Sequence, residues 1–145
     1  MRLFLDANVL VDVVLRRVDT KGKPLWFSST LILDDVSKRK HEGYVSALSL
    51  YIVNILLNPT YTKTGDLLAR EKVSGFRRFL SVIDFTDSIL QQSIEDVRLR
   101  VEDAVQFKSA VSAKAEALVT RNVRHFMLVK NEIQILVPEN LMRQA

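Results

Sequence analysis

The sequence predicts an α/β fold whose central sheet is mainly parallel and covered by helices on both faces. Short apolar runs typical of buried strands recur along the chain, and stretches with helical spacing separate them. Polar residues also follow several of the runs directly, as they do where a strand ends at a functional edge of a sheet. The chain has 145 residues and neither an internal repeat nor a linker, so we expect a single domain over 1–145.

The first strand and two helices occupy the N-terminal part. Residues 2–5 are mostly bulky and apolar, which is typical of a strand buried on both faces. Apolar residues then recur at helical spacing and predict a helix over 7–17. Pro24 suits a first helical turn, and the amphipathic stretch after it predicts a helix over 25–40, with Gly43 as its stop signal.

The middle of the chain has a less regular pattern. Residues 44–47 are typical of a short strand, and Ser49 can cap a following helix that Asn58-Pro59 would end. Proline and two glycines among polar residues predict a loop or a poorly defined helical connection over 59–75. We expect a helix to resume over about 72–80.

Strands and helices alternate again in the last part of the chain. Residues 81–85 indicate a strand, and Thr86-Asp87 can cap a helix that runs to about Glu95. Glu102-Asp103 open another helix, rich in small residues that allow close packing on a sheet. The remaining strands are predicted over 117–120 and 133–137, and Pro138 begins a short terminal helix.

Composition excludes several classes of chemistry. The chain has no cysteine, so it has no disulfide framework, thiolate nucleophile or Cys-ligated zinc, and a reducing, cytoplasmic location is expected. No apolar segment approaches the length of a membrane span. A formal charge of +4 is compatible with a polyanionic partner such as RNA.

Asp6 ends the first apolar run and has two interpretations. It is either the N-cap of the next helix, satisfying a free backbone amide, or a functional carboxylate at the carboxyl edge of the first strand. Taken alone, the stretch favours the cap.

Three polar residues are expected to converge at one edge of the sheet. Asp6 follows the first strand, Asp103 opens the helix before a later strand, and Asn122 follows that later strand. Convergent carboxylates without Cys or a His pair favour a hard cation such as Mg²⁺ or Mn²⁺. For Asp103 the competing interpretation is favourable placement at the positive end of a helix dipole.

Four ordered blocks of the sequence resemble the PIN domain family, most closely the bacterial VapC-type toxins. The blocks are Leu5-Asp6-Ala7-Asn8-Val9-Leu10-Val11-Asp12, Tyr44-Val45-Ser46-Ala47-Leu48-Ser49, Val101-Glu102-Asp103-Ala104-Val105-Gln106 and Val119-Thr120-Arg121-Asn122 with Phe126. The stretch 135–141 resembles the usual ending of the family. The resemblance implies a three-layer α/β/α sandwich and a Mg²⁺- or Mn²⁺-dependent ribonuclease with several acidic residues. It also implies a neutralising antitoxin partner and homodimerisation.

Carried over residue by residue, the resemblance makes Asp6 and Asp103 the metal ligands. The second acidic position of the family is Ile52 here, which cannot ligate a metal, and Asn54 should face away because two helical residues differ by about 200°. The last block, commonly acidic, holds Asn122 and His125 instead. With two acids assured, weak binding of Mg²⁺ or Mn²⁺ is expected.

Neighbouring residues complete the expected site. Asn122 is predicted to orient a ligand or water, beside Asp6 and Asp103 as catalytic residues. Asn8, Ser49, Thr120 and His125 are expected to line the pocket. Asp12 and Glu42 are weaker substitutes for the missing acid, and Glu102 has at most a minor role.

Basic residues beside the pocket are candidates for RNA contacts. Arg121 and Arg124 follow the fourth predicted strand, and Arg16-Arg17 close the first predicted helix. Solvated surface charge is the commoner explanation for any single one of them.

Three functions compete. The leading one is a metal-dependent endoribonuclease, possibly the toxin of a toxin–antitoxin pair; the second is a catalytically impaired PIN-fold module that binds RNA or a protein partner. A receiver or haloacid-dehalogenase-like phosphatase is disfavoured, because Asp6-Ala7-Asn8 lacks a second acid two residues on.

Overall fold

A computed structural model describes residues 1–142 and contains one five-stranded sheet in which every strand pair is parallel. The strand order is β3-β2-β1-β4-β5. The strands are β1 (Arg2–Leu5), β2 (Glu42–Ser46), β3 (Ser81–Ile83), β4 (Ala117–Val119) and β5 (Gln134–Leu136). The predicted α/β class and parallel sheet are confirmed.

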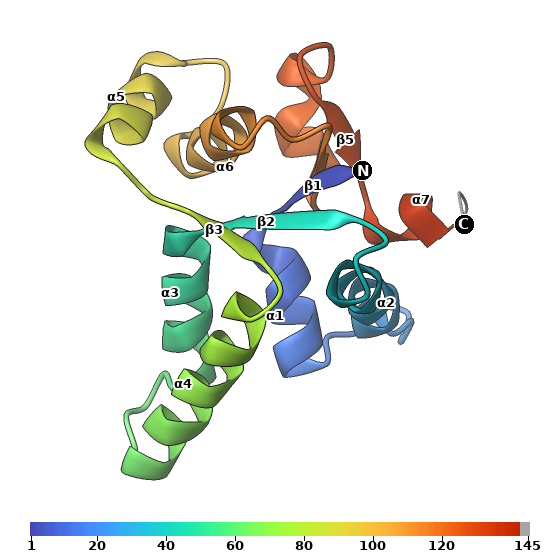
Figure 1. Cartoon of the computed structure of the whole chain (residues 1–145), viewed down its shortest axis with the longest axis vertical. Coiled ribbons are helices and arrows are strands. Elements are labelled where there is room, and N and C mark those ends of the chain that lie inside the picture. The colour runs from blue at the N-terminus through green and yellow to red at the C-terminus, as the bar shows by residue number, and fades with distance from the viewer. Residues whose placement is uncertain (143–145) are drawn as a thin grey trace.

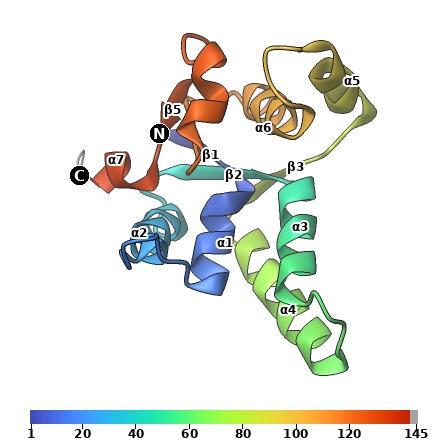
Figure 2. The same ribbon diagram turned by 180° about the vertical axis from the view of Figure 1, so that it is seen from behind.

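Helices cover both faces of this sheet (Figure 1). One layer holds α1 (Ala7–Leu15), α2 (Leu25–Ser37), α3 (Ala47–Leu57) and α4 (Lys63–Arg77); the other holds α5 (Asp87–Glu95), α6 (Val101–Ser112) and the 3₁₀ segment η1 (Val123–Val129). The short α7 (Pro138–Met142) packs beside α2. Seen from behind, α3 and α4 form a hairpin that extends away from the sheet (Figure 2).

Side chains of the central strands alternate between two cores. Leu3 and Leu5 of β1 pack with the layer of α1, α2 and α3, whereas Phe4 packs with Phe107 and Phe126 in the layer of α6 and η1. Leu3, Phe4 and Leu5 have no exposed area, so the prediction of a strand buried on both faces is confirmed.

The strand order places a topological switch point between β1 and β4. From β1 the chain proceeds outward to β2 and β3 on one side, and later returns to β4 and β5 on the other. Side by side, β1 and β4 bring Asp6 and Thr120 to adjoining carboxyl ends, where the Asp6 amide donates to the Val119 carbonyl at 3.0 Å. Ligands of open α/β sheets bind at such a point.

The stretch predicted as a loop or a poorly defined helical connection over 59–75 mostly forms a regular helix, α4. Thr62 caps this helix by accepting the Gly65 amide at 3.0 Å. Gly65 lies in the first turn, where an added Cβ would come within 2.5 Å of the Asn58 Oδ1, so this glycine serves a close approach rather than a break. A breaker residue close to a helix start was mistaken for a loop signal.

Other boundaries differ by a few residues. The helix predicted from Ser49 begins at Ala47 with Ser46 as its cap, and β3 ends at Ile83 rather than at 85. The predicted helices over 7–17 and 25–40 end earlier, and the polar cluster after β4 leads into η1. Within residues 1–142, no helix is both long and apolar enough to cross a membrane.

Candidate functional site

Asp6 lies at the switch point, where its carboxylate is held by side chains from both neighbouring segments. The Thr120 hydroxyl donates to Asp6 Oδ2 at 2.8 Å, and the Asn8 amide nitrogen donates to the same oxygen at 3.2 Å. Although Asp6 is the N-cap residue of α1, its side chain makes no capping bond to the first turn. Of its two interpretations, a side-chain cap of α1 is therefore not what the structure shows.

Burial and a second carboxylate shift the pKa of Asp6. Loss of solvent around the side chain raises it above its usual value, the Thr120 hydrogen bond opposes that rise, and the negative charge of Asp103 adds to it. The charge of Asp103 therefore reaches the Asp6 carboxyl, although the two residues lie on different elements.

Asp103 comes from the first turn of α6 and is 8% exposed, like Asp6. Its Oδ2 accepts from Arg100 Nε at 3.3 Å and lies 3.5 Å from His125 Nδ1. Arg100 Nη2 in turn contacts His125 Nδ1 at 3.3 Å. His125 Nδ1 therefore lies within reach of both Arg100 and Asp103, and its tautomer decides whether it accepts from the first or donates to the second. Arg100 and His125 thus lie beside Asp103. Of these two, His125 holds a position where the family resemblance places a further acid.

Asn8, Thr120 and Asn122 form a connected network around Asp6. Asn8 Nδ2 also lies 3.3 Å from the Thr120 hydroxyl, and its Oδ1 accepts the Arg121 amide at 3.2 Å. The Asn122 amide donates to Thr120 Oγ1 at 3.0 Å. Asn122 itself is exposed at the start of η1, so its backbone, rather than its carboxamide, is tied to the site.

The position expected to hold a second acid is aliphatic and half-buried. Ile52 lies three residues after Ser49 on α3, so the two share a helix face. Ser49 is fully buried and bonds to Gln106 of α6 at 3.1 Å. A neutral hydrogen bond therefore links α3 to the helix that carries Asp103.

The two acidic residues considered as substitutes for the missing acid form ion pairs elsewhere in the fold. Asp12 is fully buried and accepts from Arg121 Nε at 2.7 Å and from the Ser29 hydroxyl at 2.9 Å. Glu42 lies at the opposite, amino edge of the sheet and pairs with Arg2 at 3.2 Å. Neither residue supplies the missing ligand.

Asn54 and Glu102 also lie outside the pocket. Asn54 lines the groove between α3 and α4, which agrees with its predicted orientation away from Ser49. Glu102 is exposed and lies 3.7 Å from Arg100.

Of the two arginines proposed to contact RNA, Arg121 is used inside the fold. Its three guanidinium nitrogens bond to Asp12, Glu139, the Leu25 carbonyl and two serines of α2. Burial alone would raise the pKa of Glu139, but hydrogen bonds from Arg121 and Ser28 lower it overall. Arg124 is exposed, so it remains the available candidate.

The donor set at this edge is composed of oxygen and fits a hard cation only in part. Asp6 and Asp103 offer two carboxylates, the ligand type that Mg²⁺ and Mn²⁺ prefer. In the described part of the chain, however, no group of three or more acidic, His or Cys side chains is arranged to hold a metal ion. The residues described here therefore offer two carboxylates to a cation.

Sequence reasoning missed two participants, Arg100 and Gln106. Arg100 stands three residues before Asp103 and Gln106 three residues after it, so helical spacing places all three on one face. This spacing is the signal in the sequence that could have identified Arg100 and Gln106 as neighbours of Asp103. Which partner each side chain contacts depends on η1 and α3, which lie far away in the sequence.

Comparisons with known proteins agree with this architecture. The profile of the family described as PIN domain matches residues 2–124. Among solved structures, a chain of VapBC2 from Rickettsia felis, bound to a DNA fragment from their promoter, superposes with a TM-score of 0.62 at 20% identity. The alignment covers 93% of the present chain and 97% of that chain, and at this identity it bears on the fold alone. Among proteins with curated descriptions, none matches the sequence.

Proposed function

Because the chain belongs to the PIN domain family, we propose that it is an endoribonuclease that depends on a divalent metal ion. One observation carries the proposal: two buried carboxylates, Asp6 of the β1 edge and Asp103 of α6, lie close enough at the switch point for one charge to act on the other. Mutual repulsion of two buried carboxylates is relieved by a cation between them.

Each neighbour has a definite role in this proposal. Asp6 and Asp103 would hold the ion, while Thr120 and Asn8 fix the Asp6 carboxylate through its Oδ2. When bound, Mg²⁺ or Mn²⁺ would activate a water molecule and stabilise charge on a phosphodiester. Asn122, exposed at the rim, would orient the water or the RNA, and Arg124 would contact a phosphate.

Cleavage of RNA with Mg²⁺ or Mn²⁺, with and without EDTA, tests the proposal. Asp6→Asn and Asp103→Asn should each reduce cleavage by at least about 100-fold, since each removes one of two ligands. Asp87→Asn, an exposed Asp in the first turn of α5, is the matched control and should cleave normally. Cleavage that survives Asp6→Asn or EDTA would contradict the assignment.

A specific observation supports a second candidate, a PIN-fold module that binds RNA or protein without cleaving. Ile52 stands at the second acidic position, and Arg100 and His125 surround Asp103. If the chain is such a module, calorimetric titration with Mn²⁺ should give the same heat for the original protein and for Asp6→Asn. RNA should bind without being cut. Saturable Mn²⁺ binding that Asp6→Asn abolishes would exclude it.

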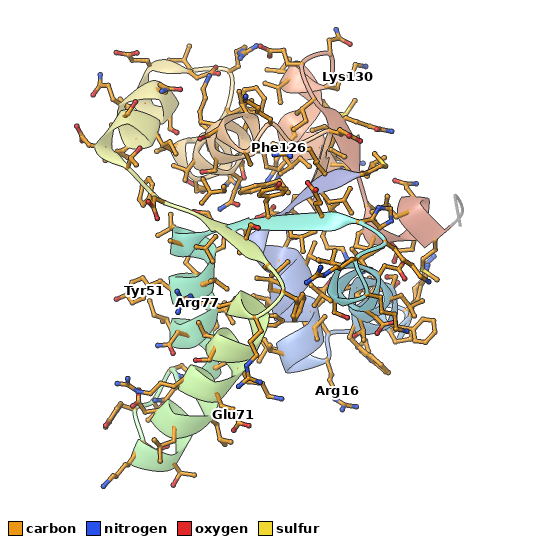
Figure 3. All side chains as sticks on the ribbon, in the orientation of Figure 1. Arg16, Tyr51, Glu71, Arg77, Phe126 and Lys130 are labelled. Atoms are coloured by element: carbon orange, nitrogen blue, oxygen red, sulfur yellow. The ribbon has the colours of Figure 1, made fainter. Side chains whose placement is uncertain are left out.

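We further propose that an antitoxin protein docks in the groove between α1, α2 and α4. The groove has an apolar floor that includes Val14, Phe76 and Phe79, with Arg16 and Lys72 among its rim residues. Figure 3 labels Arg16 and Glu71, which lie on opposite sides of the groove. An apolar floor with mainly basic rim residues suits an amphipathic acidic segment.

The product of an adjacent gene is the protein with which to test this docking site. Trp26→Ala, within the groove, should weaken its binding, whereas Tyr51→Ala, exposed on α3, should not. Binding that is lost only with Tyr51→Ala would move the site to α3. We also propose that the chain forms a homodimer. Analytical ultracentrifugation would measure its oligomeric state directly.

A further inference from the structure

Arg100 engages the acidic site with all three of its guanidinium nitrogens. Nε donates to Asp103 Oδ2 at 3.3 Å, Nη2 contacts His125 Nδ1 at 3.3 Å, and Nη1 lies 3.7 Å from Glu102. The side chain is nevertheless 63% exposed, so it covers the carboxylate from the solvent side.

The place of Arg100 in the chain is unfavourable for starting a helix. It is the N-cap residue of α6 and makes no capping bond. Ser46, Thr62 and Thr86 at the starts of α3, α4 and α5 all accept a backbone amide. A cation at the positive end of a helix dipole is also disfavoured. Helix initiation therefore does not account for the residue, whereas its contact with Asp103 does.

We propose that Arg100 is the resident counter-cation of Asp103 and competes with a divalent metal ion for that carboxylate. The inference rests on the proposed metal site and adds a residue that sets its affinity. The Asp103 side chain is 12% exposed and its Oδ2 accepts from Arg100 Nε, so a metal ion bound at Oδ2 would displace the guanidinium and one bound at Oδ1 would be repelled by its charge. Because the Arg100 side chain is 63% exposed, solvent screens this ion pair and lowers the free energy needed to displace the guanidinium.

His125 and Glu102 hold Arg100 in this position. His125 occupies a position that the family resemblance makes acidic, and its Nδ1 lies 3.3 Å from Arg100 Nη2 and 3.5 Å from Asp103 Oδ2. The cluster therefore balances the charge of Asp103 from within the chain while no divalent ion is bound.

Metal affinity measured on the intact protein tests this competition. Mn²⁺ is titrated by calorimetry into the original protein, Arg100→Gln and the control Lys130→Gln, which removes a like charge from the end of η1. Lys130 is exposed and has no role in the proposed site. We expect Arg100→Gln to tighten Mn²⁺ binding at least about threefold, as loss of a nearby competing charge should, and Lys130→Gln to leave it unchanged.

A thermal melt with and without Mn²⁺ provides a second readout that does not depend on catalysis. The Mn²⁺-induced rise in Tm should be larger for Arg100→Gln than for the original protein, and a separate melt without metal shows whether the variant folds. Arg100→Lys keeps the charge and should lie between the two.

The two proposals fail in different ways. Equal or weaker Mn²⁺ binding by Arg100→Gln overturns the competition, even if Asp103→Asn still abolishes binding and so upholds the metal site. Equal tightening by Lys130→Gln also overturns it, because the effect would then be one of general charge. Absence of Mn²⁺ binding by both the original protein and Arg100→Gln overturns the metal site and the competition together. Binding by Arg100→Gln alone supports the competition.

Discussion

Asp6 keeps its ionisable carboxylate in a buried position because two neighbours donate to it. Thr120 and Asn8 both bond to Oδ2, and the Asn8 side chain is itself held by the Arg121 amide. The direction of the Asp6 carboxylate is therefore set by residues of the adjoining strand end rather than by its own helix.

Thr120→Val tests the strongest of these hydrogen bonds. Valine keeps the shape but removes the hydroxyl, which also accepts the Asn122 amide. We expect a loss of about 1.5–3 kcal/mol of stability in urea denaturation, as for a hydrogen bond to a charged group, and weaker Mn²⁺ binding. Thr86→Val, which removes only the cap of α5, should lower stability by about 1 kcal/mol without affecting Mn²⁺. Equal effects of the two variants on Mn²⁺ affinity would contradict this role for Thr120.

At the residue scale, strand ends were predictable and side-chain partners were not. Asp6, Asp103 and Thr120 follow from where apolar runs stop and helices begin. Arg121 follows β4 in the same way, yet its guanidinium turns inward to Asp12 and Glu139. Burial of an arginine depends on acids that lie 109 and 18 residues away, which a local pattern does not contain.

At the scale of elements, Arg121 ties the segment after β4 to three helices. It reaches Asp12 on α1, two serines and the Leu25 carbonyl of α2, and Glu139 on α7. Its side chain is 14% exposed and that of Asp12 is 1% exposed, so little solvent screens the pair. The ion pair fixes where these helices sit against the sheet.

Arg121→Met should therefore be among the most destabilising substitutions. Among residues 1–142, it leaves the buried Asp12 carboxylate with Arg17, 3.9 Å away, as its one cationic partner. We expect a loss of roughly 3 kcal/mol or more in urea denaturation, as for a broken buried ion pair. Arg70→Met, which breaks an exposed pair with Asp66, should lower stability by less than about 1 kcal/mol. Similar losses for both variants would mean that the buried network contributes little.

The two glycines of α4 provide a matched pair. An added Cβ at Gly75 meets nothing within 4 Å, so Gly75→Ala should stabilise the protein by about 0.5–1 kcal/mol through helix propensity. At Gly65 the Cβ would crowd Asn58 Oδ1 at 2.5 Å and the capping Thr62 Oγ1 at 2.7 Å. Gly65→Ala should therefore be neutral or destabilising in thermal melts, and a gain equal to that of Gly75→Ala would contradict this explanation.

The same contrast explains why α4 was not predicted. Glycine lowers helix propensity wherever it occurs, so Gly65 and Gly75 together indicated a loop or a poorly defined helical connection rather than a regular helix. In the fold, Gly65 permits the Thr62 cap, and Ala69 and Phe76 are buried by packing. Tertiary contacts outweighed local propensity.

At the scale of the whole molecule, one ionic cluster joins the layer of α5, α6 and η1. Asp96 accepts from Arg98 at 2.7 Å and lies 3.0 Å from Lys108 of α6, while Arg98 also reaches Glu132 beyond η1. Hydrogen bonds from Arg98 and then from Lys108 hold the pKa of Asp96 well below its usual value of 3.8.

The sign of this shift predicts a pH dependence of stability. Because the pKa of Asp96 is lowered on folding, its contribution is fully present above pH 3.8 and is lost as pH falls toward the folded-state pKa. The difference in urea midpoint between the original protein and Asp96→Asn should therefore be largest near pH 7 and shrink below pH 3.8. A difference that is unchanged at pH 3 would contradict the assignment.

The layered architecture was more predictable than its details. Alternating strands and helices, with strands apolar on both faces, require helices on both sides of a parallel sheet. The sequence also predicted two acids rather than three at the switch point, because Ile52 cannot bind a metal in any conformation. Arg100 was not, since its contact with His125 depends on how η1 packs beside α6.

The claim that Asp6 and Asp103 together hold one divalent ion is tested most directly by a crystal soaked in Mn²⁺ and measured at the manganese absorption edge. The account predicts an anomalous peak bound to both carboxylates, with Arg100 turned away from Asp103. A fully soaked crystal without that peak, in which Arg100 still contacts Asp103, would contradict it.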